Sequence, residues 1–396
     1  MPFVLWLLAV GTFAIGTDAF VIAGVLPELA ADLSVSVGTA GQLVTVFSIA
    51  YAVFAPISAT LTGSLPRRTV LLTALVVFSL GNIISATASS FFIVALGRIV
   101  AAAGAASFTP QASGVAAALV PEGRRGSALS IVIGGLTLST ALGVPIGTLV
   151  GSRLGWRATL WLVAALGLLS LLGVAARLPT LPPGGAHSLR DRLSPLRSPA
   201  VLATLTVTLL AVCSEHLIYT YIGPVLQASS GGGGGALSVL LLVFGVGAMV
   251  GNAIAGPATD RFSDRAVLWL SVGGMTLDLA LIPWTFTHPV LAGVSMFVWG
   301  MTGWMYLVPQ QHRLLSLASR QGAFTVSLNS SALYLGIALG GAIGGVLVTV
   351  MEPRMLGLPA ALVGVSALVV ATFADRLVAA EHGQREAGVS ADKLAT

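Results

Sequence analysis

Ionisable residues interrupt two of the long apolar runs in this chain. The stretch AVCSEHLIYTYIGP, residues 211–224, carries Glu215 and His216 side by side, and the run near the N-terminus carries Asp18. Charges in apolar segments are expensive, so such residues usually have a function. A carboxyl in a low dielectric spends part of its time neutral, and one that alternates between charged and neutral forms can carry protons. We therefore expect Asp18 and Glu215 to be proton carriers; the alternative is that each lies near a helix end and reaches water.

Two further groups are candidates for proton coupling. The His216 ring titrates near neutral pH when unperturbed, so it could relay a proton or contact a substrate; alternatively it is a hydrogen-bonded packing residue. Arg98 lies inside another apolar run, where a guanidinium stays charged and must find carboxylates, carbonyls or water. We expect Arg98 to pair with Asp18 or with an acceptor on a substrate. The alternative is a structural tie to the backbone carbonyls of a neighbouring helix.

Aromatic and amide side chains in the apolar runs are candidates for contacts with an amphipathic ligand, because they combine apolar faces with polar edges. Any one of them could instead be a packing residue. The candidate substrate-binding residues are Phe20, Tyr219, Trp299, Trp304, Asn329 and Tyr334.

The composition indicates what must position these groups. The chain has 396 residues, of which 56% are hydrophobic and 8% charged, with a mean hydropathy of +0.96. Because soluble domains carry roughly 25% charged residues, the main solvent of this chain must be lipid. We expect no nucleic-acid partner, since the basic residues lie in short loops between apolar runs. The single cysteine, Cys213, excludes a disulfide within the chain and a Cys-rich metal site.

The apolar runs predict an all-α membrane protein with twelve transmembrane helices, because a helix needs about 20 apolar residues to cross a bilayer. A break rich in Pro, Gly and Arg separates two groups of six and is predicted to be a linker. The runs lie near residues 4–27, 39–61, 69–88, 91–119, 126–151, 158–178, 199–226, 236–258, 266–286, 289–312, 322–350 and 356–377.

A constant offset of 197 positions relates the two groups of six. Asp18 falls on Glu215 at this offset, and ATLTGSLPRR (59–68) falls on GPATDRFSDR (256–265). Two parallel repeats of six helices are typical of transporters that bind substrate at the repeat interface. The predicted parts are a six-helix bundle at 1–178, a cytoplasmic linker at 179–198, a second pseudo-symmetric bundle at 199–378 and a cytoplasmic tail at 379–396.

Lysine and arginine positions predict the orientation in the membrane, because these residues accumulate in cytoplasmic loops. Of the 19 such residues, fifteen fall in one set of alternate loops and the C-terminal tail. The opposite set holds only Arg153, Arg157 and Arg354, and Arg98 lies within a span. Both termini and the linker are therefore predicted to be cytoplasmic.

Small residues in the fifth span are candidates for conformational control. Gly143 and Gly147 repeat every four residues, so they form a smooth stripe along which another helix can approach closely. Pro145 lies between them, removes a backbone donor and bends the span. We expect this stripe to form a tight interface between the halves that can hinge or seal.

Charged residues at the turn between the eighth and ninth spans are a second candidate for conformational control. Asp260, Arg261 and Arg265 lie together at a loop predicted to be cytoplasmic. We expect these residues to form a latch that breaks when the two halves rock against each other. The alternative is a solvated loop that only sets the orientation of the chain.

Four stretches carry a resemblance to a known family. The chain resembles transporters of the major facilitator superfamily over nearly its whole length. Within them it is most similar to the twelve-helix drug:proton antiporters, in the branch of bacterial arabinose and chloramphenicol exporters. The stretches resemble, in order, the first-helix signature, the fourth-helix motif, the fifth-helix antiporter motif and the loop motif: GTDAFVIAGVLPELAADL (16–33), GRIVAAAGAA (97–106), GVPIGTLVGSRLGWR (143–157) and GPATDRFSDR (256–265).

The resemblance implies proton-coupled efflux of small amphipathic compounds, such as chloramphenicol-like drugs, by alternating access across a bacterial inner membrane. The expected partners are a small-molecule substrate, protons and the lipid bilayer, and we expect a monomer without a cofactor or metal. Two alternatives are an exporter of sugars or nucleosides and a non-transporting membrane sensor or scaffold. An enzyme is not expected, because no metal cluster or Ser/His pair recurs at helical spacing and the glycine run at 229–235 lacks a following Gly-Lys-Ser/Thr.

Overall fold

The protein is described by a computed structural model that covers residues 2–121, 124–181, 190, 193–317 and 322–395. Within these ranges, twelve helices are long and apolar enough to cross a membrane, which confirms the predicted all-α class. Parts of the predictions lie outside the described residues: positions 182–189 and 191–192 of the linker, the last residue of the tail, and Arg192 and Arg320, which are two of the fifteen basic residues counted above.

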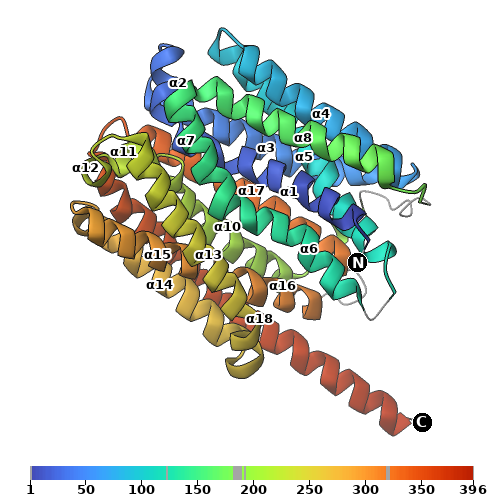
Figure 1. The fold of residues 1–396 in the computed structure, drawn as a ribbon. Helices are drawn as coiled ribbons and strands as arrows, with labels where there is room; N and C mark the ends of the chain where they lie inside the picture. Colours follow the sequence, from blue (N-terminus) through green and yellow to red (C-terminus); the bar gives the residue numbers. More distant parts are fainter. Residues whose placement is uncertain (1, 122–123, 182–189, 191–192, 318–321, 396) are drawn as a thin grey trace.

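The first half of the chain, α1 to α8, supplies six of the spans (Figure 1). The fifth span consists of α6, a π-helical turn η2 and α7 in continuous succession. The elements are α1 (Val4–Gly24), α2 (Leu26–Asp32), α3 (Val37–Leu61), α4 (Arg67–Thr87), α5 (Phe91–Ala118), α6 (Arg125–Leu138), η2 (Ser139–Gly143), α7 (Val144–Leu154) and α8 (Trp156–Arg177).

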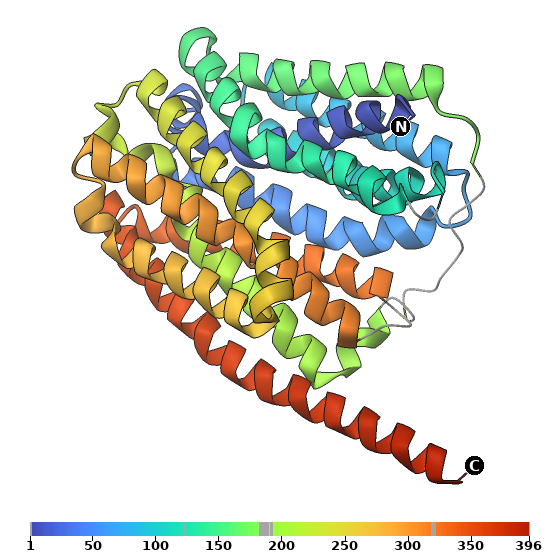
Figure 2. The ribbon, with the colours of Figure 1, turned by 60° about the horizontal axis from the view of Figure 1, so that its bottom comes forward.

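The second half, α10 to α18, supplies the other six spans, and its last helix extends beyond the bundle to the C-terminus (Figures 1 and 2). This helix runs without a break through most of the predicted tail. The elements are η3 (Ser194–Arg197), α10 (Pro199–Tyr219), α11 (Ile222–Val225), α12 (Gln227–Ser230), α13 (Gly234–Phe262), α14 (Asp264–Thr285), α15 (Pro289–Met305), α16 (Leu307–Leu317), α17 (Gly322–Leu347), η5 (Pro353–Leu356) and α18 (Gly357–Ala395).

The repeat offset of 197 holds for the helix boundaries. The helices that begin at Val37 and Arg67 have counterparts that begin at Gly234 and Asp264, 197 positions later in both cases. The first span and its counterpart begin at Val4 and Pro199, within two residues of the same offset. The two halves are therefore structural repeats, and a residue in one half has a defined counterpart in the other.

Serine side chains fix several of the helix starts. Ser36, Ser90 and Ser198 each accept a hydrogen bond from the backbone N–H three residues later, at the first turns of α3, α5 and α10. Ser263 does the same for α14. Each such cap satisfies a backbone donor that the helix itself leaves unpaired.

Most helix packing lies within each half, although α3 of the first half also packs extensively against α17 of the second. In the first half α4 packs against α5 and α8, and α1 packs against α6 and α8; in the second half α10 packs against α17 and α18, and α13 against α15. Large apolar side chains such as Phe92, Leu172 and Leu362 remain exposed on the outer faces of the helices. Such a surface suits lipid rather than water.

The halves meet closely at one end of the molecule. We call the end where α1 begins and α3 ends the basic end, and the end where α1 ends and α3 begins the opposite end. At the opposite end, a Cβ on Gly38 would overlap the backbone carbonyl of Gly345 in α17, and a Cβ on Gly234 would overlap Ser152 in α7. Glycine at positions 38 and 234 thus lets the two halves touch there.

The predicted role of the fifth-span glycine stripe needs correction. A Cβ on Gly143 would overlap Thr17, and one on Gly147 would overlap Val21, so the stripe packs against α1 of its own half. The face of this span that meets the second half is different: Ala141 lies against Gly245 of α13. Pro145 follows the π-helical turn, and it cannot donate a backbone hydrogen bond to the turn before it.

Candidate functional site

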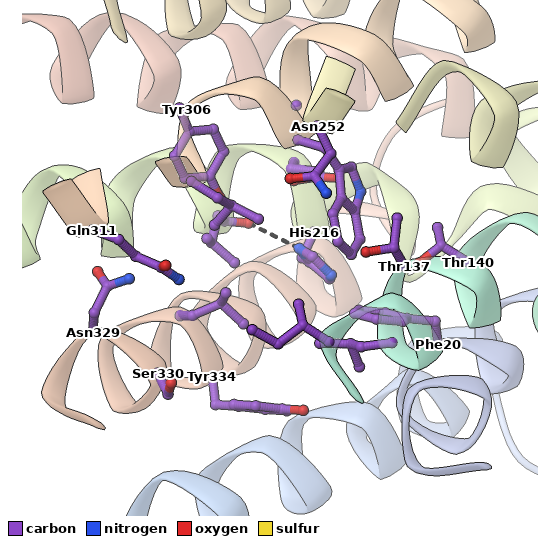
Figure 3. Close-up of a pocket in the computed structure, with 18 of the residues that line it drawn as sticks. Phe20, Thr137, Thr140, His216, Asn252, Tyr306, Gln311, Asn329, Ser330 and Tyr334 are labelled. Atoms are coloured by element: carbon purple, nitrogen blue, oxygen red, sulfur yellow. Dashed lines mark hydrogen bonds between the residues drawn. The ribbon is translucent and has the colours of Figure 1, made fainter. Parts of the chain in front are cut away.

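A cavity of about 350 Å³ lies between the two halves. Its wall combines α1, α3, α5, α6 and η2 of the first half with α10, α13, α15, α16 and α17 of the second. In Figure 3, Phe20 lies with Thr137 and Thr140 on one side of the cavity, and Gln311 lies with Asn329 on the other. A site at the repeat interface is the usual place for a ligand in a protein of this plan.

Access to the cavity differs between its two ends. Gln311 is exposed, and Asn252 and Thr109 are half-buried, so the wall reaches solvent towards the basic end. Tyr219 and Phe244 line the cavity nearer the opposite end and are both buried. The cavity is therefore open towards the basic end and closed where the glycines bring the halves together.

Five of the six predicted substrate-binding residues line this cavity, and Trp299 does not. Trp299 is fully buried behind the wall, with its ring edge-on to those of Tyr219 and Phe244 at centroid distances of 6.2 and 5.3 Å. Trp299 lies one helical turn before Gly303, which does line the cavity. The rings of Tyr219 and Phe244, which also line the cavity, cover Trp299. Its predicted place on the wall is wrong. The lining residues are Phe20, Tyr219, Trp304, Asn329 and Tyr334.

Glu215 lies on the cavity wall and is 5% exposed. Its carboxyl packs against Gly303 of α15, where a Cβ would lie 3.5 Å from Oε1. Within the described part of the chain, the carboxyl makes no ion pair and no hydrogen bond. When such a buried carboxyl is ionised, no neighbouring cation compensates its charge. It can therefore gain or lose a proton without breaking an ion pair.

His216 is also buried and also lines the cavity. Its Nδ1 lies 3.1 Å from the backbone carbonyl oxygen of Val212, one helical turn earlier (Figure 3). Its Nε2 is buried and has no hydrogen-bond partner. The ring lies 5.9 Å from that of Phe20 and 5.7 Å from that of Tyr219. One face of the site is thus formed by three aromatic rings.

Asp18 occupies a different environment from the expected one. It is fully buried and forms an ion pair with Arg98, with 2.5 Å between Oδ1 and Nη1, and its backbone carbonyl accepts a second hydrogen bond from Nη2 at 3.2 Å. The guanidinium also lies over the ring of Phe47 at 4.1 Å. The structure brings Asp18 and Arg98 together as the sequence suggested. However, Asp18 does not line the cavity, because Arg98 holds it within the first bundle.

A stacked tyrosine pair lies between the ion pair and the second half. Tyr51 of α3 and Tyr334 of α17 stack with a centroid distance of 3.6 Å and an interplanar angle of 18°. Phe47, which lies under the Arg98 guanidinium, is 6.4 Å from each of these two rings. Both tyrosines line the cavity, so aromatic rings separate the ion pair from the open space.

A network of polar side chains positions Asn329. Thr208 of α10 donates a hydrogen bond to Asn329 Oδ1 at 2.8 Å, and Gln310 donates to the Thr208 hydroxyl at 3.0 Å. Gln310 also donates to the backbone carbonyl of Thr204 at 3.0 Å. These bonds tie α10, α16 and α17 together on the second-half side of the cavity.

The predicted charged latch is organised differently in the structure. Arg265 and Arg313 both bind Asp375 of α18, at 3.0 and 2.6 Å, so this cluster joins three helices of the second half. Asp260 and Arg261 are exposed at the end of α13. The contact of Arg265 therefore lies within one half rather than between the halves. Sequence reasoning missed Asp375 because the last span has no counterpart acid in the first half to draw attention to it.

Other cavity residues were also missed. Thr137 and Thr140 lie in the fifth span, for which the sequence suggested a conformational role rather than a place on the cavity wall, and Asn252, Tyr306 and Gln311 lie in the second half. Polar residues inside apolar spans were the available signal for all of them. The spacing of such residues does not show which face of a helix meets the cavity. A face that packs against a neighbouring helix has the same width and the same spacing as a face that lines the cavity.

Comparisons with known proteins agree with this architecture. A model of the Major Facilitator Superfamily matches residues 8–325. Inner membrane transport protein YdhP of Escherichia coli (strain K12) is 33% identical over 342 residues, which cover 86% of this chain and 88% of YdhP. The Chloramphenicol resistance protein of Streptomyces lividans is 36% identical over 337 residues, which cover 84% of this chain and 80% of that protein.

Solved structures show the same fold. A bacterial homolog of the human lysosomal transporter Spinster, in an inward-facing and occupied conformation, has a TM-score of 0.76 at 16% identity and covers 95% of this chain and 97% of its own. A D-xylose-proton symporter has a TM-score of 0.74 at 16% identity, covering 93% and 96%. By its family match and its relatives, the chain belongs to the major facilitator superfamily and is a multi-pass membrane transporter.

Proposed function

We propose that this transporter exports small amphipathic compounds by alternating access and that Glu215 couples this export to protons entering the cell. The observation that carries the proposal is the Glu215 carboxyl, which has no ion pair among the described residues, on the wall of a cavity otherwise lined by aromatic, aliphatic, hydroxyl and amide side chains. A carboxyl that binds a proton on one side of the membrane and releases it on the other converts the proton gradient into work. Among the residues that the structure describes, no cation forms an ion pair with the Glu215 carboxyl.

The shape of the cavity supports alternating access. It is closed at the opposite end, where glycines of α3 and α13 meet α17 and α7, and open at the basic end. The arginine-rich loops at the basic end support a cytoplasmic position for that end. In this conformation a compound from the cytoplasm or the inner leaflet can enter, and separation of the opposite end would release it outside.

The cavity lining favours amphipathic compounds with little charge. Phe20, Tyr219, Trp304 and Tyr334 offer aromatic faces, and Asn329 offers an amide held in place by Thr208. The relative from Streptomyces lividans is a chloramphenicol resistance protein, and chloramphenicol is a neutral aromatic compound of this kind. We therefore take chloramphenicol as the first substrate to test.

The experiment measures chloramphenicol flux in proteoliposomes with an imposed pH difference. The parent should move more chloramphenicol when the difference drives protons inward, and Glu215→Gln should lose this dependence, because the amide has the size of the protonated acid but cannot release a proton. The matched control is Asp278→Asn. Asp278 is a buried acid of the same half that accepts hydrogen bonds from Ser295 at 3.0 Å and does not line the cavity.

Asp278→Asn should respond to the pH difference as the parent does. An equal response from Glu215→Gln would remove Glu215 as the coupling group and direct the test to Asp18. If the parent moves no chloramphenicol in either condition, growth of a sensitive host across a panel of antibiotics would identify another substrate. Protection against no compound in that panel would contradict export of antibiotics.

A further inference from the structure

We propose that Phe20, His216 and Tyr219 form a subsite for an aromatic ring bearing a hydrogen-bond donor, with His216 Nε2 as the acceptor. The three rings lie at the buried side of the cavity, and Phe20 comes from the first half whereas the other two come from the second. The inference rests on the proposed function only in that the cavity binds the substrate. It concerns recognition rather than coupling.

The tautomer of His216 follows from its bond to Val212. A backbone carbonyl can only accept, so the 3.1 Å contact requires that Nδ1 carries the hydrogen. In the neutral ring Nε2 then carries a lone pair and can only accept. The local helix geometry thus presents an acceptor rather than a donor to the ligand.

The acceptor has no hydrogen-bond partner in the part of the chain that the structure describes. His216 Nε2 is buried without a hydrogen bond, and so are the hydroxyls of Tyr219 and Thr140, which line the same cavity. Buried polar atoms are usually paired in folded proteins, and those that are not deserve an explanation. Here three unpaired polar atoms border one cavity, and a ligand that supplies a donor to Nε2 would satisfy the atom that the fold leaves open.

The three rings also define the shape of the ligand. Phe20 lies 5.9 Å from His216 with a tilt of 37°, and 6.1 Å from Tyr219 with an angle of 85°. Tilted and edge-to-face arrangements at these distances are favourable for aromatic groups, so the three rings suit a further ring that enters the cavity beside them. Because Phe20 is in α1 and His216 in α10, a ring bound here contacts both halves at once.

The proposed need for a hydrogen-bond donor on the ligand can be tested with two ligands that differ only in whether they carry that donor. 1-Naphthol donates a hydrogen bond, whereas 1-methoxynaphthalene has the same ring system and only an acceptor. Equilibrium binding to the purified full-length protein in detergent would be measured by the quenching of protein fluorescence, at about pH 8, where an ordinary imidazole is neutral. The parent should bind 1-naphthol about 10-fold more tightly, as expected for one unsatisfied buried acceptor.

Two variants separate the acceptor from the ring. His216→Phe keeps an aromatic ring and removes the acceptor, so the affinity for 1-naphthol should fall about 10-fold while that for 1-methoxynaphthalene stays the same. His216→Gln restores an acceptor near the position of Nε2 and should recover the preference for 1-naphthol. Unchanged binding of 1-methoxynaphthalene by His216→Phe also shows that this variant is folded.

The outcomes distinguish this inference from the proposed function. The binding assay contains no pH gradient, so its result does not depend on proton coupling, and Asp278→Asn, whose side chain does not line the cavity, should keep the preference for 1-naphthol. A preference that survives in His216→Phe would overturn the inference, and so would failure of the parent to bind either ligand. Loss of the preference in His216→Phe together with its return in His216→Gln would establish Nε2 as the acceptor.

Discussion

Asp18 and Glu215 occupy the same position in the two repeats, 197 residues apart, yet they have opposite surroundings. Asp18 forms an ion pair with Arg98 in the interior of the first bundle, whereas Glu215 faces the cavity and has no ion pair among the described residues. The counterpart of Arg98 in the second half is Ser295, whose hydroxyl binds Asp278 instead. The second half therefore keeps the acid of the repeat and lacks its base.

This difference separates two tasks that a buried carboxyl can perform. A carboxyl with a guanidinium at hydrogen-bond distance forms an ion pair that joins two helices. A carboxyl without a partner can change its protonation state without breaking an ion pair. On this basis the first half supplies a fixed link between α1 and α5, and the second half supplies the group that we assign to proton exchange.

Breaking the ion pair of the first half should have the largest effect on stability. Arg98→Ala leaves the Asp18 carboxylate buried and unpaired, so we expect the free energy of unfolding to fall by about 3–5 kcal/mol. The measurement is denaturant-induced or thermal unfolding in detergent. In the double variant Asp18→Asn/Arg98→Ala most of this loss should return, because no charge remains uncompensated. Equal stability of the parent and Arg98→Ala would show that the pair contributes nothing.

Replacing a glycine between the halves by a larger residue should have a smaller effect than Arg98→Ala. It should change the balance between conformations rather than the stability of the fold. The Cβ of Gly38→Val would overlap the Gly345 carbonyl, so the closed state should be disfavoured by about 1–3 kcal/mol. The reporter is Thr45→Cys in a Cys213→Ser background, because Thr45 is buried where it donates to the Ala338 carbonyl across the halves. A membrane-impermeant maleimide added at the opposite end should label this cysteine faster in Gly38→Val.

The control for this comparison is a glycine within one half. Gly143→Ala would crowd the Thr17 side chain of the same bundle, so it should leave the labelling rate of Thr45→Cys unchanged. If Gly143→Ala increased labelling as much as Gly38→Val, the fifth-span stripe would control closure after all. That result would restore the expectation drawn from the sequence.

A surface ion pair at the opposite end provides a third contrast between the halves. Hydrogen bonds from Arg157, and then from Trp156, hold the pKa of Asp32 below its ordinary value of 3.8. This pair thus stabilises the fold above pH 3.8, and its contribution disappears as the pH falls through the lower folded-state pKa. Since both side chains are more than a third exposed, Asp32→Asn should cost less than about 1 kcal/mol at neutral pH.

The matched variant in the second half is Glu352→Gln. Arg354, the counterpart of Arg157, pairs with Glu352 only two residues away, and Ser229 stands at the counterpart of Asp32. A pair between neighbours joins no separate elements, so Glu352→Gln should change the unfolding free energy less than Asp32→Asn does. A larger loss in Glu352→Gln would contradict this ranking.

Removing the charge from the second half should have the smallest effect on folding. Glu215→Gln replaces a carboxyl that has no ion pair or hydrogen bond in the described structure with an amide of the same size, so we expect no resolvable change in unfolding free energy. The same variant should lose proton-driven flux completely. A loss of stability comparable to that of Arg98→Ala would instead indicate that Glu215 is held by a charged partner.

The sequence alone predicted the twelve spans, the repeat offset and the pairing of Arg98 with Asp18. Spans follow from length and hydropathy, because lipid accepts only long apolar segments with their backbone groups paired. The ion pair follows because a guanidinium in an apolar span needs a nearby carboxylate or carbonyls. These inferences need only the local chemistry of each segment.

Other features depended on how the helices are rotated and packed. Trp299 points behind the cavity wall, the Gly143 stripe faces α1, and Arg265 binds Asp375 of its own half. In a soluble helix the polar face marks the outside, but a span surrounded by lipid and other helices is apolar on most faces. Its hydropathy pattern therefore carries little information about which face meets which neighbour.

The sequence by itself thus determined the class of fold, the repeat and the set of ionisable residues inside the membrane, since each of these depends on the solvation of a single segment. Only the tertiary structure decided which acid meets a base and which meets the cavity. The reason is that Asp18 and Glu215 have equivalent places in the repeat, and the difference lies in their neighbours: Arg98 reaches Asp18, whereas the carboxyl of Glu215 packs against Gly303, which has no side chain to pair with it.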